Sequence, residues 1–227
     1  MNTRILGVDV DGGFAKYVVI PAENARPTDR CVPAKIAAFQ DALGNAVHTV
    51  MAGPVKDQNI LITGMGPIGL FAVSVCKALG ARSVIGTEVS DYRIDLAHKI
   101  GTDHVLNPRE VDLDRAIEEL VPGGVDATLE MSGHPSSLAL AIRRTRPGGR
   151  ISLLGVFPES NQTIDMNAVI FKGIDKLGWI VDASPLSIRL AAWLDQAEPA
   201  NRWYLELVAP WRVPLPRLSV PVASVPM

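Results

Sequence analysis

The stretch Gly64-Met65-Gly66-Pro67-Ile68-Gly69 decides the fold of this chain. It follows an apolar run, residues 59–63, and precedes a helical pattern from Leu70 to Leu79. A second apolar run, residues 83–87, ends at the acidic Glu88. Strand, glycine turn, helix, strand and acid, in this order, are typical of a dinucleotide-binding site.

Each part of this pattern has a physical role. Gly64 permits the tight turn, Gly66 lets the backbone approach a pyrophosphate, and Gly69 lets the helix pack close to the strand. The helix N-terminus offers free N–H groups and a positive dipole end to the phosphates. Glu88 can accept hydrogen bonds from both hydroxyls of the adenosine ribose and would repel a 2′-phosphate, which favours NAD over NADP. The alternative is a glycine turn without a ligand.

Composition indicates a globular protein of one large or two small domains, with 227 residues and a net charge of −2. No basic stripe suggests nucleic acid, and the apolar runs have the length of strands rather than of membrane-spanning helices. The N-terminus lacks a signal-peptide core, so we expect a cytoplasmic protein. Cys31 and Cys76 lie far apart without a CxxC motif, which argues against a disulfide framework or a structural zinc site.

Alternating patterns along the chain predict an α/β fold. Residues 1–33 are expected to form loops and a short strand at Phe14–Ile20, as the remnant of an N-terminal β domain, and residues 34–52 a helix. Strands are then expected near 59–63, 82–87, 104–106, 125–131, 149–155 and 174–180. Helices are expected near 67–79, 91–100, 110–121, 135–145 and 166–172. This alternation predicts a doubly wound parallel (Rossmann) sheet within residues 34–180.

The composition changes abruptly after Gly178. The chain contains no further glycine beyond that position and no lysine after Lys176, whereas all four tryptophans lie at or after Trp179. Prolines interrupt the remaining sequence and remove backbone donors. We therefore expect residues 181–227 to form a divergent, Pro-rich tail, and hypothesise a reading-frame shift near residues 178–182.

Five segments carry a resemblance to a known family: residues 12–21, 41–49, 64–69, 88–93 and 130–133. With them the chain resembles the zinc-dependent medium-chain alcohol dehydrogenases, and among these the L-threonine 3-dehydrogenases. The resemblance extends from about Asn2 to Gly178. Sorbitol and butanediol dehydrogenases are the closest alternatives.

The resemblance implies a reaction and a set of cofactor residues. In that family a catalytic zinc polarises the substrate hydroxyl and a hydride passes to NAD, so that L-threonine becomes 2-amino-3-ketobutyrate; the enzymes are homotetramers. Carried over residue by residue, it implies that the NAD site consists of Gly64, Gly66, Pro67, Ile68, Gly69, Glu88, Arg93, Leu154 and Gly155. Leu154 and Gly155 match the strand end beside the nicotinamide.

The metal site departs from the family pattern. The family's Cys and His-Glu ligands and its four-cysteine lobe have no counterpart here, and neither cysteine matches a ligand position. Asp41 matches a carboxylate that can approach the zinc, but a catalytic zinc needs about three protein ligands, so the alternative is an unpaired acid beside a helix. His48 is the candidate catalytic residue; the alternative interpretation is that His48 is structural or solvated. We expect a truncated chain that binds NAD and is inactive alone.

Overall fold

The computed structural model describes residues 4–25, 27–29, 32–159 and 161–178. The chain divides into two compact units, Met1–Ala37 and Ala38–Met227. The tail expected at 181–227 and the proposed frame shift beyond Gly178 lie outside the described residues.

The first unit contains little regular structure in its described residues. They form a 3-10 helix, Ala22–Asn24, a four-residue helix α1 (Ala34–Ala37) and an isolated bridge between Leu6 and Val10. The strand expected at Phe14–Ile20 is not formed. A strand requires a neighbouring strand to accept its hydrogen bonds, and these residues are exposed instead.

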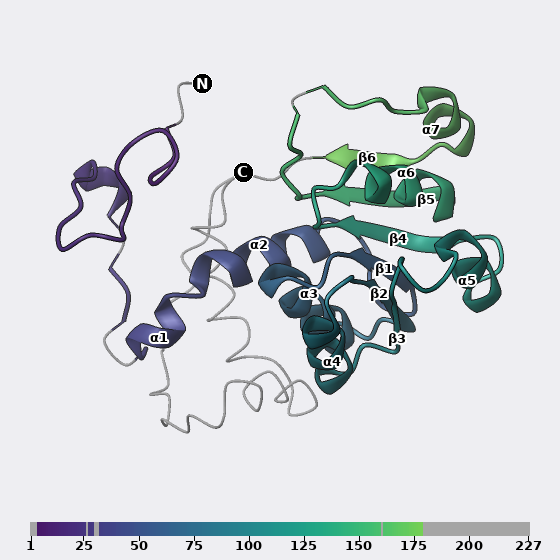
Figure 1. The fold of residues 1–227 in the computed structure, drawn as a ribbon, viewed down its shortest axis with the longest axis horizontal. Coiled ribbons are helices and arrows are strands. Elements are labelled where there is room, and N and C mark those ends of the chain that lie inside the picture. The colour runs from purple at the N-terminus through teal and green to yellow at the C-terminus, as the bar shows by residue number, and fades with distance from the viewer. Residues whose placement is uncertain (1–3, 26, 30–31, 160, 179–227) are drawn as a thin grey trace, which may run out of the picture. The chain divides into compact units, whose positions relative to one another are not determined.

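The second unit is a parallel sheet covered by helices on both faces (Figure 1). Among the described residues its six strands follow the order β3-β2-β1-β4-β5-β6, in which the direction of winding reverses between β1 and β4. The strands are β1 (Asn59–Thr63), β2 (Ser83–Thr87), β3 (His104–Leu106), β4 (Val125–Glu130), β5 (Thr145–Leu153) and β6 (Asp175–Gly178). The predicted doubly wound fold is confirmed.

The helices divide between the two faces of the sheet. They are α2 (Gln40–Val50), α3 (Pro67–Ala78), α4 (Asp91–Ile100), α5 (Leu113–Leu120), α6 (Pro135–Arg144) and α7 (Met166–Lys172). Ile60 and Ile62 of β1 are fully buried in a cluster shared with α2, α3 and α4, while Leu61 is buried in a cluster shared with α5 and α6. Since successive side chains of a strand point to opposite faces, β1 is buried on both sides.

Local chemistry places the helix boundaries. The Asp112 carboxylate accepts a hydrogen bond from the Arg115 N–H at the start of α5, and Asp165 accepts one from the Ala168 N–H at the start of α7. Gly101, with φ of 96°, ends α4 in the left-handed conformation, as its sequence position predicts.

Two further predicted elements differ from the structure. The helix expected over 34–52 is broken between α1 and α2, at the boundary of the two units. The strand expected near 149–155 is β5, which begins earlier than predicted, at Thr145. Its register jumps from Val125↔Thr145 to Ala127↔Arg150, so the first part of the strand carries a bulge.

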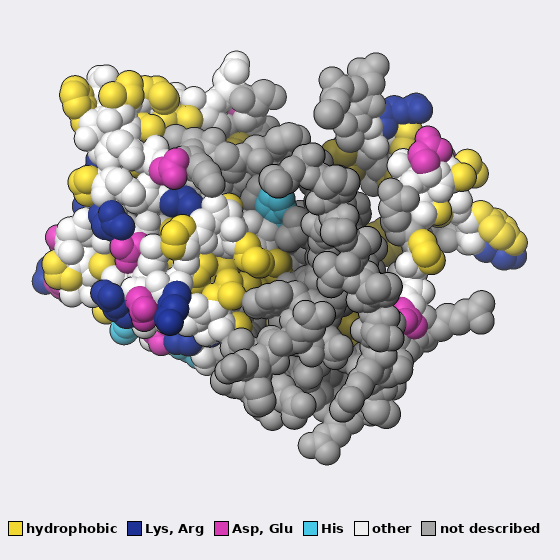
Figure 2. Space-filling view, turned by 180° about the vertical axis from the view of Figure 1, so that it is seen from behind, with side chains coloured by type: hydrophobic (Ala, Val, Ile, Leu, Met, Phe, Trp, Pro, Cys, Tyr) yellow, Lys and Arg dark blue, Asp and Glu magenta, His cyan; other side chains and the backbone are white. Residues whose placement is uncertain are grey.

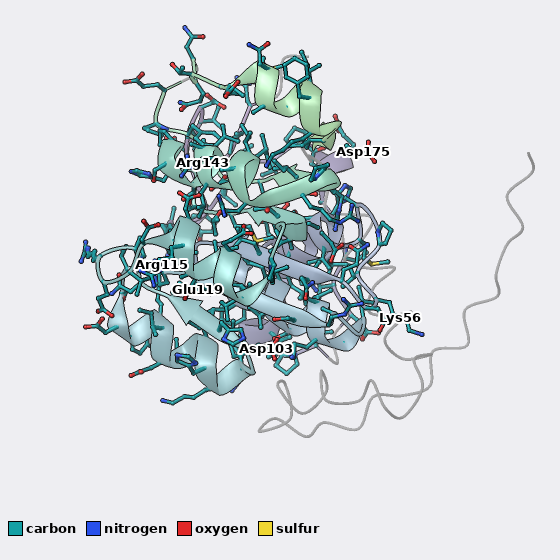
Figure 3. All side chains as sticks on the ribbon, turned by 90° about the vertical axis from the view of Figure 1, so that its right-hand side faces the viewer. Lys56, Asp103, Arg115, Glu119, Arg143 and Asp175 are labelled. Carbon is teal, nitrogen blue, oxygen red and sulfur yellow. The ribbon has the colours of Figure 1, made fainter. Side chains whose placement is uncertain are left out.

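Charges of both signs are interspersed on the face of the sheet domain shown in Figure 2. On α5, Arg115 and Glu119 lie one helical turn apart and form an ion pair with an N–O distance of 2.8 Å (Figure 3). Within the described ranges, no helix is long and apolar enough to span a membrane.

Candidate functional site

The candidate site lies at the carboxyl ends of the strands, where the sheet order reverses between β1 and β4. Open parallel sheets bind ligands in the crevice at such a switch point. The glycine turn joins the end of β1 to the start of α3 at this position, so the topology brings the sequence motif to the expected place.

The three glycines of the turn meet three different steric demands. Gly64 has a φ of +87°, and a Cβ on it would lie 3.0 Å from the Cα of Ser132. A Cβ on Gly69 would overlap the carbonyl oxygen of Gly64. A Cβ on Gly66 would meet nothing within 4 Å and would enter open space at the N-terminus of α3. Gly64 and Gly69 are thus required by the fold, whereas Gly66 leaves room for a ligand.

Pro67 and Ile68 begin α3. Pro67 occupies the first helical turn, where its missing N–H removes no helical hydrogen bond. Ile68 is partly buried against the core that contains α2, α3 and α4. The N–H groups of Ile68 and Gly69 lie in the first turn and have no acceptor within the helix, so they can donate to an anion.

Glu88 lies directly after β2 and is only 6% exposed. Its Oε2 accepts a hydrogen bond from the Met65 N–H at 3.0 Å, and its Oε1 accepts from the N–H groups of Val89 and Ser90 at 2.8 and 3.1 Å. A carboxylate offers about four acceptor positions, so about one is left for a ribose hydroxyl rather than the two expected from the sequence. The bond to Met65 also ties the glycine turn to β2.

Arg93 extends from the first turn of α4 towards the same carboxylate. Its guanidinium Nη1 lies 3.7 Å from the Glu88 Oε2, and its side chain is half exposed. Arg93 is therefore placed beside the acid that the sequence predicts to bind the ribose, with its donors accessible to a ligand.

Leu154 and Gly155 follow β5 and bind the neighbouring strand through their main chain. Their N–H groups donate to the Glu130 carbonyl oxygen at 2.9 and 3.1 Å. A Cβ on Gly155 would overlap the Gly133 N and lie 2.5 Å from the Glu130 Oε2. Glu130 and Gly133 thus belong to the site although sequence reasoning assigned them no role; the available signal was that Glu130 ends an apolar strand and that Gly133 follows it closely.

The structure does not bring Asp41 and His48 into a metal site. Asp41 is exposed on α2 and its Oδ2 accepts a hydrogen bond from the Asn45 Nδ2 at 3.1 Å. His48 lies further along α2 and its Nδ1 is buried without a hydrogen-bond partner among the described residues. The part of the chain that the structure describes contains no group of three or more His, Cys, Asp or Glu side chains arranged to hold a metal. The described residues therefore do not fit a catalytic zinc.

Cys76 of α3 is fully buried, and this burial raises the pKa of its thiol to about 12. Arg150, which lies near it on β5, is also buried, and its guanidinium donates to the carbonyl oxygens of Thr49 and Val50 at 3.3 Å. These contacts hold the end of α2 against the sheet. A shallow hollow of about 240 Å³ lies nearby, at the amino ends of the strands rather than at the glycine turn, and is lined by Met51, Gly53, Val55, Lys56 and Leu79.

Comparisons with known proteins agree with this geometry. Residues 67–194 match the family model described as zinc-binding dehydrogenase. L-threonine 3-dehydrogenase of Pyrococcus horikoshii is 46% identical over 179 residues, which are 78% of this chain and 51% of that protein. The enzyme of the same name from Chromobacterium violaceum is 43% identical over 178 residues, with 78% and 52% covered. The chain thus spans about half the length of the curated relatives it matches.

Solved structures show the same fold. An alcohol dehydrogenase from Escherichia coli CFT073, in complex with NADH, superposes with a TM-score of 0.74 at 27% identity, covering 85% of this chain and 57% of that one. A zinc-binding dehydrogenase from Sinorhizobium meliloti, bound to NADP, gives a TM-score of 0.67 at 29% identity, covering 76% and 52%. The two neighbours differ in their cofactor, so the choice between NAD and NADP depends on this chain's own residues.

Proposed function

Since this chain belongs to the zinc-binding dehydrogenase family, we propose that its second unit binds NAD(H) across the switch point and serves the NAD-dependent oxidation of L-threonine to 2-amino-3-ketobutyrate. The observation that supports cofactor binding is the open space that a Cβ on Gly66 would enter, at the N-terminus of α3. The high identity with L-threonine 3-dehydrogenases supports the substrate. A small-molecule substrate agrees with the family.

The residues at the switch point have distinct tasks in this proposal. The N–H groups of Ile68 and Gly69 donate to the pyrophosphate, and the remaining acceptor position of Glu88 binds a hydroxyl of the adenosine ribose. Arg93 lies beside that ribose. Leu154 and the turn after it line the nicotinamide side. When bound, NAD supplies the ring that accepts the hydride, and this chain's contribution is to hold and orient it.

A second candidate function is NAD(H) binding without turnover by this polypeptide. It is favoured by the observation that Asp41 and His48 are not joined by further potential ligands in the described part of the chain. Polarisation of a substrate hydroxyl by zinc requires about three protein ligands. We therefore propose that this chain by itself binds NAD(H), and that the oxidation of L-threonine is the reaction that this domain serves.

Calorimetric titration of the 227-residue chain with NAD tests the cofactor proposal. We expect saturable binding of one NAD per chain. The absence of binding at about 1 mM NAD, which corresponds to a weak binding free energy of about −4 kcal/mol, would contradict the proposal. A matched titration of the Gly66→Ala variant shows whether the heat arises at the glycine turn.

Formation of NADH in the presence of zinc tests turnover. L-threonine, sorbitol and butanediol are supplied in parallel, because the last two are substrates of the alternative relatives. We expect no turnover by the chain alone. Zinc-dependent NADH formation from threonine would contradict the second candidate and support full activity, whereas preference for sorbitol or butanediol would contradict the threonine assignment. The homotetrameric state and the cytoplasmic location of the protein stay predictions. Light scattering checks the oligomeric state.

A further inference from the structure

Glu130 ends β4 at the switch point and is a buried carboxylate of unusual environment. Its side chain is fully buried, and no ion pair joins it to a basic residue in the described ranges. Burial of a charge is unfavourable unless hydrogen bonds replace the lost water. The partners of its two carboxylate oxygens therefore decide what Glu130 does.

One oxygen accepts hydrogen bonds from four donors, three in the turn after β4 and one at the end of β1. The Glu130 Oε1 accepts from the Ser132 N–H at 3.0 Å, the Ser132 Oγ at 2.5 Å and the Gly133 N–H at 3.0 Å. It also faces the Thr63 Oγ1, at the end of β1, at 3.3 Å. The side chain thus fixes the turn after β4 and links this turn to β1.

The other oxygen lies behind the turn that follows β5. The Glu130 Oε2 is buried and has no hydrogen-bond partner among the described residues. It lies 2.5 Å from the position that a Cβ on Gly155 would take, and the same Cβ would overlap the Gly133 N. The turns after β4 and β5 therefore meet at two glycines, with the carboxylate beneath them.

The chemistry of this pocket favours a carboxylate over an amide. At Oε1 a glutamine oxygen could still accept hydrogen bonds, but without the negative charge that strengthens them. At Oε2 an amide group would place two N–H donors in a buried position where the carboxylate oxygen has no hydrogen-bond partner among the described residues, and a buried unpaired donor is unfavourable. Glutamine at this position should loosen the two turns without changing the shape of the side chain.

Glu88 performs the corresponding task on the other half of the sheet. It ties the glycine turn to β2 through the Met65 N–H, independently of Glu130. A dinucleotide lies across the switch point with one nucleotide over each half. The adenosine half lies on the side of β2 and Glu88, so the nicotinamide half lies over the ends of β4 and β5.

From this geometry we infer that Glu130 is a positioning residue for the nicotinamide half of the cofactor: it holds the turns at Ser132-Gly133 and Leu154-Gly155 in the arrangement that receives it. The inference rests on the proposed NAD(H) binding. It assigns separate carboxylates to the two halves of the dinucleotide, Glu88 to adenosine and Glu130 to nicotinamide.

Binding of NADH and of ADP-ribose, which lacks only the nicotinamide ring, separates the two roles. In Glu130→Gln we expect the dissociation constant for NADH to rise about tenfold and that for ADP-ribose to stay within about twofold. In Glu88→Gln the dissociation constants for NADH and for ADP-ribose should rise by similar factors. Glu119→Gln, at the exposed ion pair of α5, is the control and should change neither. A parallel loss of both ligands in Glu130→Gln, or no loss of either, would overturn the inference.

Hydrogen exchange of the unliganded chain supplies a readout that does not depend on cofactor. The amides of Ser132, Gly133 and Gly155 should exchange faster in Glu130→Gln, while those of Met65 and Val89 should be unchanged. Ser132→Ala removes one donor and should shift the same amides less, which keeps the test decisive if Glu130→Gln fails to fold. Unchanged exchange in both variants would refute the positioning role. If the unmodified chain bound neither ligand, the proposed function would fail, and exchange would still decide whether Glu130 holds the turns.

Discussion

Two glycines of the same turn should respond to alanine in opposite ways. Gly66 has φ and ψ of −68° and −177°, which any residue adopts, and a Cβ there meets nothing within 4 Å. Alanine should therefore leave the free energy of unfolding unchanged or raise it by about 0.5 kcal/mol, because it restricts the unfolded chain. The same methyl group occupies the space in which the pyrophosphate approaches the backbone.

The loss in affinity at Gly66 can be estimated from the hydrogen bonds at risk. A methyl group that keeps the phosphate away from the N-terminus of α3 removes at least one charge-assisted hydrogen bond, a loss of about 2 kcal/mol. The dissociation constant for NADH should therefore rise about thirtyfold. At Gly69 the Cβ would overlap the Gly64 carbonyl oxygen, a backbone atom that cannot move away alone. Gly69→Ala should lower the free energy of unfolding by about 3 kcal/mol, or the melting temperature by roughly 10 °C.

Thermal unfolding and fluorescence titration with NADH, performed on both variants, check this pair. Gly13→Ala is the control, because a Cβ there also meets nothing within 4 Å but lies outside the sheet domain. The reasoning is refuted if Gly66→Ala binds NADH as tightly as the unmodified chain, or if it is destabilised as much as Gly69→Ala. The first result would mean that the phosphates do not approach the backbone at Gly66, and the second that a Cβ at Gly66 does not enter open space.

Three further predictions concern charges. NADP should bind at least about tenfold more weakly than NAD in parallel calorimetric titrations, because its 2′-phosphate meets the Glu88 carboxylate, and equal affinities would contradict this. Arg150→Met keeps the packing of the side-chain stem but removes the donors to the end of α2. Urea denaturation should therefore show that the free energy of unfolding falls by about 2 to 3 kcal/mol, and a change below about 0.5 kcal/mol would be contrary evidence. The Arg143 hydrogen bond holds the pKa of the Asp114 carboxyl below its usual range, so it stabilises the fold above the ordinary pKa near about 4 and this contribution disappears as pH falls through the lowered value. Asp114→Asn should flatten the fall in unfolding free energy on acidification, and an unchanged slope would count against the pair.

The order of elements in the sheet domain could be predicted from sequence because each signal is local. All of them lie within residues 59–88: the apolar run, the glycine turn after it and the acidic residue after the next strand. Local turn chemistry therefore determines the order of these elements. The strand predicted at Phe14–Ile20 failed for the opposite reason. Its apolar, β-branched residues satisfy the local pattern, but a strand exists only where another strand accepts its hydrogen bonds.

The partners of the buried charged groups could not be predicted in this way. Glu88 was expected to bind a ligand, and its side chain is instead largely engaged with main-chain N–H groups, one of them 23 residues away. Glu130 reaches Thr63 over 67 residues, and Arg150 reaches Thr49 over 101. Such contacts arise from the register of parallel strands and the position of α2, neither of which a sequence window contains.

These contacts bear on how the two functional tests should be interpreted. Among the described residues, the hydrogen bonds that fix the glycine turn and its neighbours lie within the second unit: Thr63, Met65, Glu88, Glu130 and Gly155 bind one another or adjacent main chain. The residues that we propose to hold the dinucleotide therefore lie in this unit, whereas turnover also requires zinc ligands that its described residues do not assemble. A chain that binds NADH tightly and does not oxidise threonine would agree with both observations. Failure to turn over consequently says nothing against the cofactor site, and the role of Glu130 is tested by a loss of NADH binding that spares ADP-ribose and by hydrogen exchange at the two turns.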